Sequence, residues 1–316
     1  INYITKTTAA KGNNTMNKQF KTELKYYNLT AKEFYKNHKL IQDSIKHARQ
    51  KIKNALNNEG ILDWSKLPKL LGNNPKLEKS GKYKALTNGF SGSPSFTSGY
   101  NTCNFASSCS KTCLGFAGHG QQHMLYEGKH IVLIARITRT ILFYEYRQQF
   151  LKQLHKEIKL FYNRVMNKNK KHNTNYICAI RLNVLTDINW EKIDITLFTD
   201  NPDITFYDYT KNPFRNIEHI DNYSLTFSRN EHNDLYCEQA FNNNMNVAIV
   251  VDIKKGYTIP ETFRNKPCLD GDLHDARFLD KKNHYIVLRK KETGIVDTSG
   301  FILNVNDWFN PVKIAA

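Results

Sequence analysis

The chain has 316 residues, with 46 lysines and arginines against 29 aspartates and glutamates, which gives a formal net charge of +17 at pH 7. Hydrophobic residues make up 40% of the sequence, enough for one large domain, or one domain with an appendage, and this excludes a disordered protein. No window approaches the roughly 20 apolar residues of a membrane span, and no secretion signal is visible. We therefore expect a cytoplasmic protein with reduced cysteines and no membrane contact.

The positive charge favours a polyanionic partner, for which nucleic acid or a nucleotide is the usual choice. A genome rich in A and T also encodes many lysines and asparagines, and this chain contains many of both. The charge alone leaves both explanations open.

Residues 1–80 are predicted to form a basic helical extension. Residues 1–18 are polar and offer little to bury. Thr30 and Glu33 have the spacing of a capping box, apolar residues then recur at helical spacing, and Gly60 is expected to close the helix. The opposite face is rich in lysine and arginine, as in a solvated helix face or in a helix that lies on phosphates.

Residues 81–316 are predicted to form an α/β domain. We expect a strand at residues 83–88, a cysteine loop at 103–120 and a long helical region over about 130–167, broken once at most. Short apolar runs then predict mainly parallel strands, joined by crossover segments at 190–198, 237–243 and 259–263. These strands are expected at residues 176–182, 204–207, 223–227, 247–251 and 284–288. The pattern favours a partial or irregular (β/α) barrel.

The cysteine loop is the strongest chemical signal in the chain. Cys103, Cys109 and Cys113 fall within eleven residues, so their thiolates can bind one metal centre and leave one coordination position open. The spacing C-x5-C-x3-C matches neither a zinc ribbon nor a bacterial ferredoxin. Three interpretations remain: an iron–sulfur cluster, a zinc ion with His119 or His123 as fourth ligand, or simple buried thiols.

Polar side chains follow the ends of successive predicted strands. Because the carboxyl ends of parallel strands meet at one edge of a sheet, these side chains are predicted to share a site there, although loops are often polar in any case. The catalytic candidates are Asp187, Asp208, Lys211 and Arg229. The candidates for binding a cofactor or substrate are Arg136, Asn183, Ser228, Asp270, Asp272 and Asp275.

Several blocks of the sequence resemble a family of bacteriophage and prophage proteins that has no established activity. They are CNFASSCSKTCLGFAGHG, RLNVLTDINWE, FYDYTKNP and DGDLHDARFLD, in the family's order, within roughly residues 103–301. The resemblance implies a phage protein in the cytoplasm of the host cell. The chain departs from the family at residues 184–187, where Val-Leu-Thr-Asp stands in place of Gly-Thr-Ser-Asp and the aspartate is kept.

The layout more remotely resembles that of radical S-adenosylmethionine enzymes, which place a three-cysteine loop after the first strand of a partial (β/α) barrel. This resemblance implies a [4Fe–4S] cluster on Cys103, Cys109 and Cys113, with S-adenosylmethionine bound to the fourth iron through its amino and carboxylate groups. The cysteine spacing departs from that class, and no glycine-rich contact for the cofactor is evident.

Two alternatives leave the cysteines structural. The first is a metal-dependent nuclease, in which Asp187, Asp208, Asp252, Asp270 and Asp272 gather divalent cations and Tyr207 or Tyr209 acts as a nucleophile. The second is a protein that binds nucleic acid without catalysis, which explains the charge but not the polar strand ends.

Overall fold

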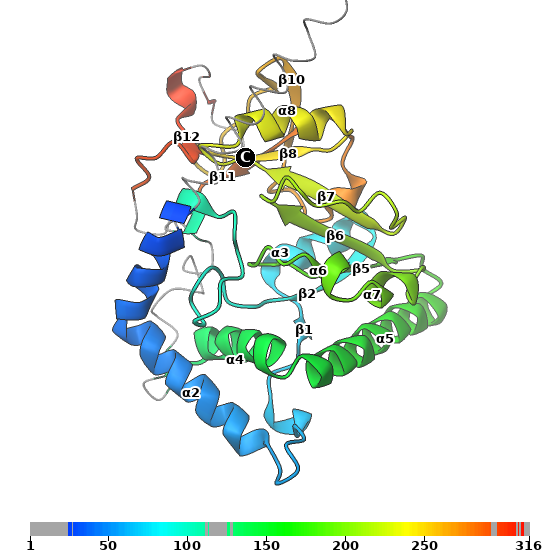
Figure 1. Ribbon diagram of the computed structural model, residues 1–316. Helices are drawn as coiled ribbons and strands as arrows, with labels where there is room; N and C mark the ends of the chain where they lie inside the picture. Colours follow the sequence, from blue (N-terminus) through cyan, green and yellow to red (C-terminus); the bar gives the residue numbers. More distant parts are fainter. Residues whose placement is uncertain are drawn as a thin grey trace, which may run out of the picture.

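A mostly parallel sheet of ten strands organises the chain (Figure 1). This computed structural model describes residues 25–26, 28–110, 113, 125–126, 129–291, 296–307, 309 and 311–312. The strands lie in the order β1-β2-β5-β6-β7-β8-β11-β10-β9, and β12 also pairs with β8. The bounds are β1 Leu71–Gly72, β2 Ala85–Phe90, β5 Ile177–Arg181, β6 Thr205–Thr210, β7 Tyr223–Ser228, β8 Val247–Val251, β9 Thr262–Phe263, β10 Lys266–Asp270, β11 Tyr285–Arg289 and β12 Ile302–Leu303.

Neighbouring strands from β2 to β11 are parallel and follow one another in chain order. Antiparallel pairs form only at the two ends of this sheet, between β1 and β2 and between β9 and β10. The predicted mixed α/β class with mainly parallel strands is therefore confirmed. Within the described residues the sheet is open, because β1 and β9 at its edges do not pair with each other.

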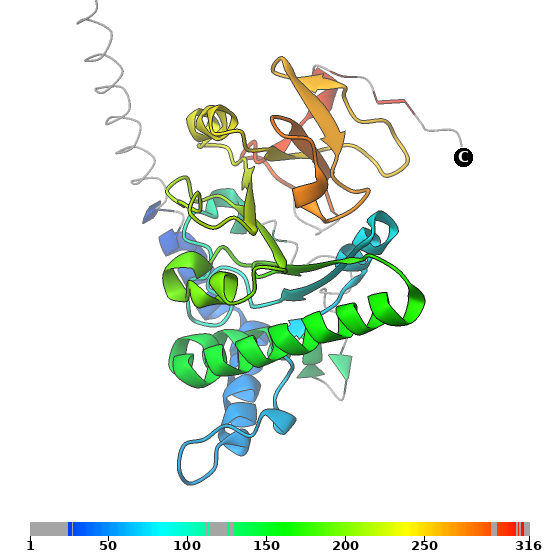
Figure 2. The same cartoon turned by 90° about the vertical axis from the view of Figure 1, so that its right-hand side faces the viewer.

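Two long helices, α4 (Ile131–Glu145) and α5 (Arg147–His172), form much of the main core. Their apolar stripes pack under β2 and β5, and Figure 2 shows α5 running along this side of the sheet. The break predicted in this region is confirmed at Tyr146, whose φ of −127° and ψ of 42° separate the two helices. The helices are α2 Lys39–Ala55, α3 Pro75–Glu78, α4 Ile131–Glu145, α5 Arg147–His172, α6 Trp190–Ile193, α7 Thr196–Thr199 and α8 Asp234–Asn242.

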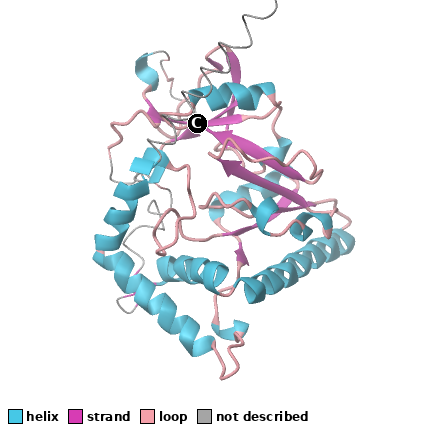
Figure 3. Cartoon of the chain, in the orientation of Figure 1, coloured by secondary structure: helices cyan, strands magenta, loops and turns pink. Residues whose placement is uncertain are grey.

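The long helices gather at one end of the molecule. Figure 3 shows α2, α4 and α5 on the side of β1 and β2, whereas α8 lies near β8, β10 and β11 at the other end. Helix α2 packs on α4, and its Ala48 and Ile52 belong to the same core cluster as Ile137 and Ile141. A smaller hairpin of β3 (Leu125–Tyr126) and β4 (Lys129–His130) precedes α4.

Three local predictions are wrong: the cap at Thr30, the helix end at Gly60 and the crossover helix at 259–263. Thr30 lies inside a helical segment at residues 28–37 and does not cap it; the helix breaks at His38, and α2 ends at Ala55, before Gly60. The predicted crossover at 259–263 has no helix, because β9 and β10 form a short antiparallel pair there.

Candidate functional site

Two adjoining cavities form a cleft at the carboxyl ends of the parallel strands. The smaller, of about 140 Å³, is lined by Cys103, Cys109 and Cys113 and by residues that follow β5, β6 and β7; we call it the cysteine pocket. The larger, of about 370 Å³, extends toward β8 and β11; we call it the cationic cavity. Both cavities are lined by Cys109, Arg181, Tyr209, Lys211 and Ser228.

Hydrogen bonds tie the cysteine loop to the strand ends. The Asp187 amide, after β5, donates to the Thr102 carbonyl at 2.8 Å. The Glu231 carboxylate, after β7, accepts from the Ser107 hydroxyl at 2.7 Å and from the Ser108 amide at 3.0 Å. These contacts lie on both sides of Cys103 and next to Cys109, so they hold residues 102–109 against the same edge of the sheet that carries the polar residues.

The three cysteines line the same pocket and lie near the same neighbouring residues. The Ser95 amide donates to Cys103 Sγ at 3.4 Å, and burial raises the pKa of the Cys103 thiol to about 12. The Tyr35 hydroxyl donates to the Ser110 carbonyl at 2.9 Å, and the pKa of this phenol is raised, first by burial and then by the charges of all three cysteines. The three cysteines therefore line one pocket and lie within electrostatic reach of Tyr35.

As placed, the described residues contain no group of three His, Cys, Asp or Glu side chains close enough to hold one metal ion. None of the three cysteines forms a disulfide within the described part of the chain. The two histidines that the sequence offers as a fourth zinc ligand, His119 and His123, lie outside the described residues.

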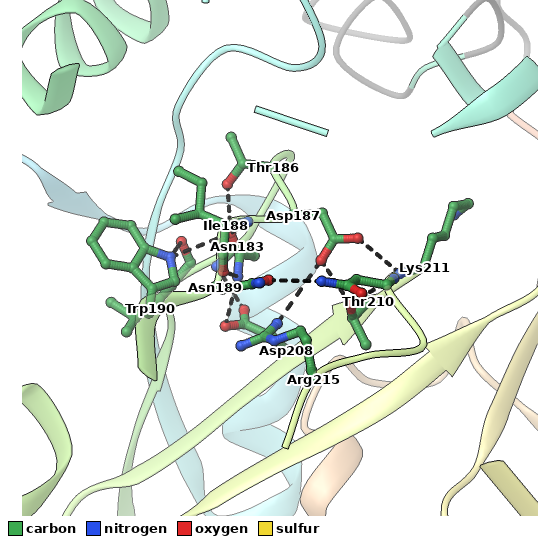
Figure 4. A network of polar contacts seen from close by, with 12 residues as sticks. Asn183, Thr186, Asp187, Ile188, Asn189, Trp190, Asp208, Thr210, Lys211 and Arg215 are labelled. Atoms are coloured by element: carbon green, nitrogen blue, oxygen red, sulfur yellow. Dashed lines mark hydrogen bonds and ion pairs between the residues drawn. The ribbon is translucent and has the colours of Figure 1, made fainter. Parts of the chain in front are cut away.

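Asp187 and Lys211 both line the cysteine pocket, and Figure 4 shows them side by side, joined by a hydrogen bond. The Asp187 carboxylate accepts from the Thr210 hydroxyl at 2.7 Å and from the Lys211 amide at 2.8 Å. The Lys211 ammonium donates to the Ser228 hydroxyl at 2.8 Å. The ends of three successive strands thus bring a carboxylate, an ammonium group and a hydroxyl to the lining of one pocket.

Asn183 organises the turn between β5 and α6. Its side-chain oxygen accepts from the Ile188 amide and the Thr186 hydroxyl, each at 2.8 Å, and its side-chain amide donates to the Ile188 carbonyl at 2.9 Å (Figure 4). Trp190, which follows, packs against Phe90 and Phe143 in the core. The turn is therefore held by hydrogen bonds of the Asn183 side chain.

Asp208 is buried beneath this turn and does not line either cavity of the cleft. Its carboxylate accepts from the Asn183 amide at 2.6 Å, the Asn183 side chain at 3.1 Å and the Tyr223 hydroxyl at 2.7 Å. Burial raises its pKa to about 7, although the Arg215 charge and these hydrogen bonds act in the opposite direction. The geometry gives Asp208 a positioning role for Asn183.

The raised pKa of Asp208 predicts a pH dependence of stability. The folded state keeps a proton on this carboxyl that the unfolded chain has released, so its contribution is fully present below about pH 4 and is lost as the pH rises toward 7. Urea denaturation of the wild type and Asp208→Asn should show the difference in unfolding free energy falling by roughly 3 kcal/mol over that range, at about 1.4 kcal/mol per pKa unit. A difference that stays constant with pH would contradict the assignment.

The remaining sequence candidates occupy separate places. Arg229 does not line either cavity of the cleft: it pairs with Asp234 at 2.9 Å and donates to the Gly300 carbonyl. Burial lowers the pKa of Arg136, and the charge of Cys113 partly offsets this, which places Arg136 near the third cysteine. Asp270 and Asp272 bind Arg289 at 2.9 and 3.5 Å, and of the two only Asp272 lines the cationic cavity.

Asp275 belongs to a buried ion cluster that the sequence did not reveal. Arg181 donates to both of its carboxylate oxygens at 3.0 Å, Lys76 lies 3.0 Å from one of them, and the Tyr207 hydroxyl donates at 3.1 Å. In the sequence, Arg181 stands out as a charged residue at the end of an apolar strand. Lys76 lies in a lysine-rich connector, and no sequence pattern singles it out.

Fold and site together define an α/β protein with an open, mostly parallel sheet and a cysteine-lined cleft at the carboxyl edge of its strands. The Gene product 88 family matches residues 65–304, so the chain belongs to this family, and the predicted phage-type relationship is confirmed. No curated protein and no solved structure matches the chain. Among the described helices, none combines the length and the apolar character that crossing a bilayer requires.

Proposed function

We propose that this protein is an iron–sulfur enzyme of the radical S-adenosylmethionine type, with Cys103, Cys109 and Cys113 as ligands of a [4Fe–4S] cluster. One observation carries the proposal: three cysteines from the loop after the first parallel strand, β2, line the same pocket as the polar ends of β5, β6 and β7. Three thiolates leave one iron of such a cluster open to a further ligand.

The strand order supports the same proposal. β2, β5, β6, β7, β8 and β11 are parallel neighbours in chain order, which is the winding of a partial (β/α) barrel. A site at the carboxyl ends of such strands is where this architecture places its chemistry.

The residues of the pocket would have distinct tasks. The cluster, when bound, would supply an open iron for the amino and carboxylate groups of S-adenosylmethionine. The Ser95 amide, which already donates to Cys103 Sγ, would tune the cluster, since hydrogen bonds to sulfur are one determinant of its potential. Asp187 would accept a hydrogen bond from an ammonium group, and Lys211 would hold an anionic one at the boundary of the two cavities.

The nuclease alternative finds less support. Asp208 is enclosed by Asn183 and Tyr223, Asp252 pairs with Lys290 at 2.8 Å, and Asp270 pairs with Arg289. Within the described part of the chain, neither these acids nor the three cysteines, as placed, form a group of three metal ligands. The nuclease is less supported because its acids are already engaged by these partners. We therefore carry only the iron–sulfur proposal further.

Anaerobic purification followed by metal analysis and an optical spectrum tests the proposal. We expect about four iron atoms per chain and a broad absorbance near roughly 400 nm that disappears on oxidation. One equivalent of zinc without iron would instead indicate a structural site completed by a residue outside those described. Protein that remains free of metal after anaerobic reconstitution with iron and sulfide would overturn the proposal.

A further inference from the structure

The cationic cavity gathers an unusual number of basic side chains. Among the described residues, seven lysines and arginines line it, against one carboxylate, that of Asp272. The basic residues are Lys76, Lys79, Arg181, Lys211, Arg289, Lys290 and Lys291.

Ion pairs compensate only part of this charge. Lys76 and Arg181 share Asp275, and Lys290 pairs with Asp252. Arg289 and Lys291 are matched by Asp270 and Asp272, at 2.9 and 3.0 Å.

Two lysines of this lining have no ion pair among the described residues. Lys79 donates to the Asp272 carbonyl at 2.7 Å, and Lys211 donates to the Ser228 hydroxyl at 2.8 Å. Each of these contacts uses one donor of the ammonium group. Because an ammonium group has three N–H donors, both lysines keep donors that these contacts do not use. The cavity therefore retains a surplus of positive charge and of unused donors.

One side of the cavity is apolar. It consists of Val250 on β8, Leu288 on β11 and the adjacent Phe301 and Ile302. The Lys211 ammonium lies 5.4 Å from the centre of the Phe301 ring, so the aromatic surface and the unpaired cation adjoin. A ligand that fits must combine an anionic group with a flat apolar portion.

The volume sets the size of the ligand. About 370 Å³ lies near the lower end of the range for small-molecule sites, roughly 300–1,000 Å³, which suits a single nucleotide. The two cavities adjoin at Cys109 and Lys211, so such a ligand would lie next to the cysteine pocket.

From this geometry we infer that the cationic cavity binds a mononucleotide, with its phosphate on the lysines and its base against Phe301. Its role as the substrate rests on the proposed function, whereas the binding itself does not. The phosphate would approach Lys79, which is exposed and makes no ion pair among the described residues. The side chains of Lys290 and Lys291 are 43% and 50% exposed, so their ammonium groups can turn from their carboxylate partners toward the phosphate.

Calorimetric titration of the full chain with adenosine 5′-monophosphate, adenosine and inorganic phosphate tests the inference. We expect saturable binding of the nucleotide and binding at least about tenfold weaker for the nucleoside, because charged hydrogen bonds contribute about 1.5–3 kcal/mol. The double variant Lys290→Ala/Lys291→Ala should weaken nucleotide binding by a similar factor. The double variant Lys156→Ala/Lys159→Ala removes the same charge from the exposed face of α5 and should bind as the wild type does.

Three results would overturn the inference: equal affinity for nucleotide and nucleoside, an equal loss in both double variants, or tighter binding of a short single-stranded oligonucleotide that ignores Lys290 and Lys291. The last would assign the charge to a nucleic-acid surface. Iron is measured on the same preparation. Nucleotide binding by protein that holds no iron would refute the proposed function and support the inference. Iron in protein that binds no nucleotide would support the proposed function and refute the inference.

Discussion

Replacement of Cys109 by serine should reduce the iron content of anaerobically purified protein from about four atoms per chain to less than about one, with loss of the absorbance near roughly 400 nm. A serine hydroxyl is a poor substitute for a thiolate, and a cluster held by only two cysteines has two exposed irons. Cys103→Ser and Cys113→Ser should behave alike, because all three sulfurs line one pocket.

The matched control is Cys268→Ser. This cysteine is on β10, is also a half-buried free thiol, and does not line the cysteine pocket. Its variant should keep the full iron content. Thermal unfolding of each variant separates loss of iron from loss of fold. If Cys109→Ser retained its iron, or if Cys268→Ser lost as much, the assignment of ligands would be refuted.

Asp275→Asn should lower the free energy of unfolding by about 3–5 kcal/mol, the largest effect on stability that we expect from one substitution. The Asp275 side chain is 0% exposed and that of Arg181 7%, so the change leaves a buried guanidinium without its counter-charge. Lys76, at 35% exposure, can turn toward water and adds less to the loss. Urea denaturation at neutral pH measures the difference.

Asp252→Asn provides the comparison, because Asp252 pairs with Lys290 while both side chains are nearly half exposed. Its cost should stay below about 1 kcal/mol. The Arg181 and Lys76 charges hold the pKa of Asp275 well below its usual range despite burial, so this stabilisation is present above about pH 4 and is lost as the pH falls further. Asp275→Asn should therefore be less sensitive to acid than the wild type. Equal costs for the two variants would show that the buried cluster is not important for stability.

The central strands could be predicted because burial on both faces demands continuous apolar runs. Val247–Val251 is strand β8 with the predicted bounds, and β5 and β7 deviate from theirs by a residue at an end. The strands β9 and β10 were missed, since they lie at the edge and their residues are mostly only half buried. The capping box at Thr30 failed because Tyr35 and Ile41 pack in a small cluster of their own, which fixes the helical segment independently of its cap signal.

The sequence predicts which strands carry the candidate site residues, but it does not predict on which face of a strand each side chain lies. Successive side chains of β6 alternate, so Tyr209 faces the cleft while Asp208 points to Asn183 and Tyr223 on the opposite side. Lys211 and Asp187 lie beyond the strand ends and reach the pocket. The pairing of Lys76 with Asp275 joins segments 199 residues apart, and a single sequence carries no signal for it.

The hydrogen bonds from Ser107 and Ser108 to Glu231 have a consequence for the order of assembly. The cysteine segment leaves the ribosome more than 120 residues before Glu231, so the pocket cannot form until that residue has been synthesised. The thiols of a nascent chain remain unorganised until β7 has joined the sheet. Loading of any cofactor is thereby postponed to a late stage of folding, and a chain truncated before residue 231 would fold its long helices yet leave the sulfur-bearing loop without support.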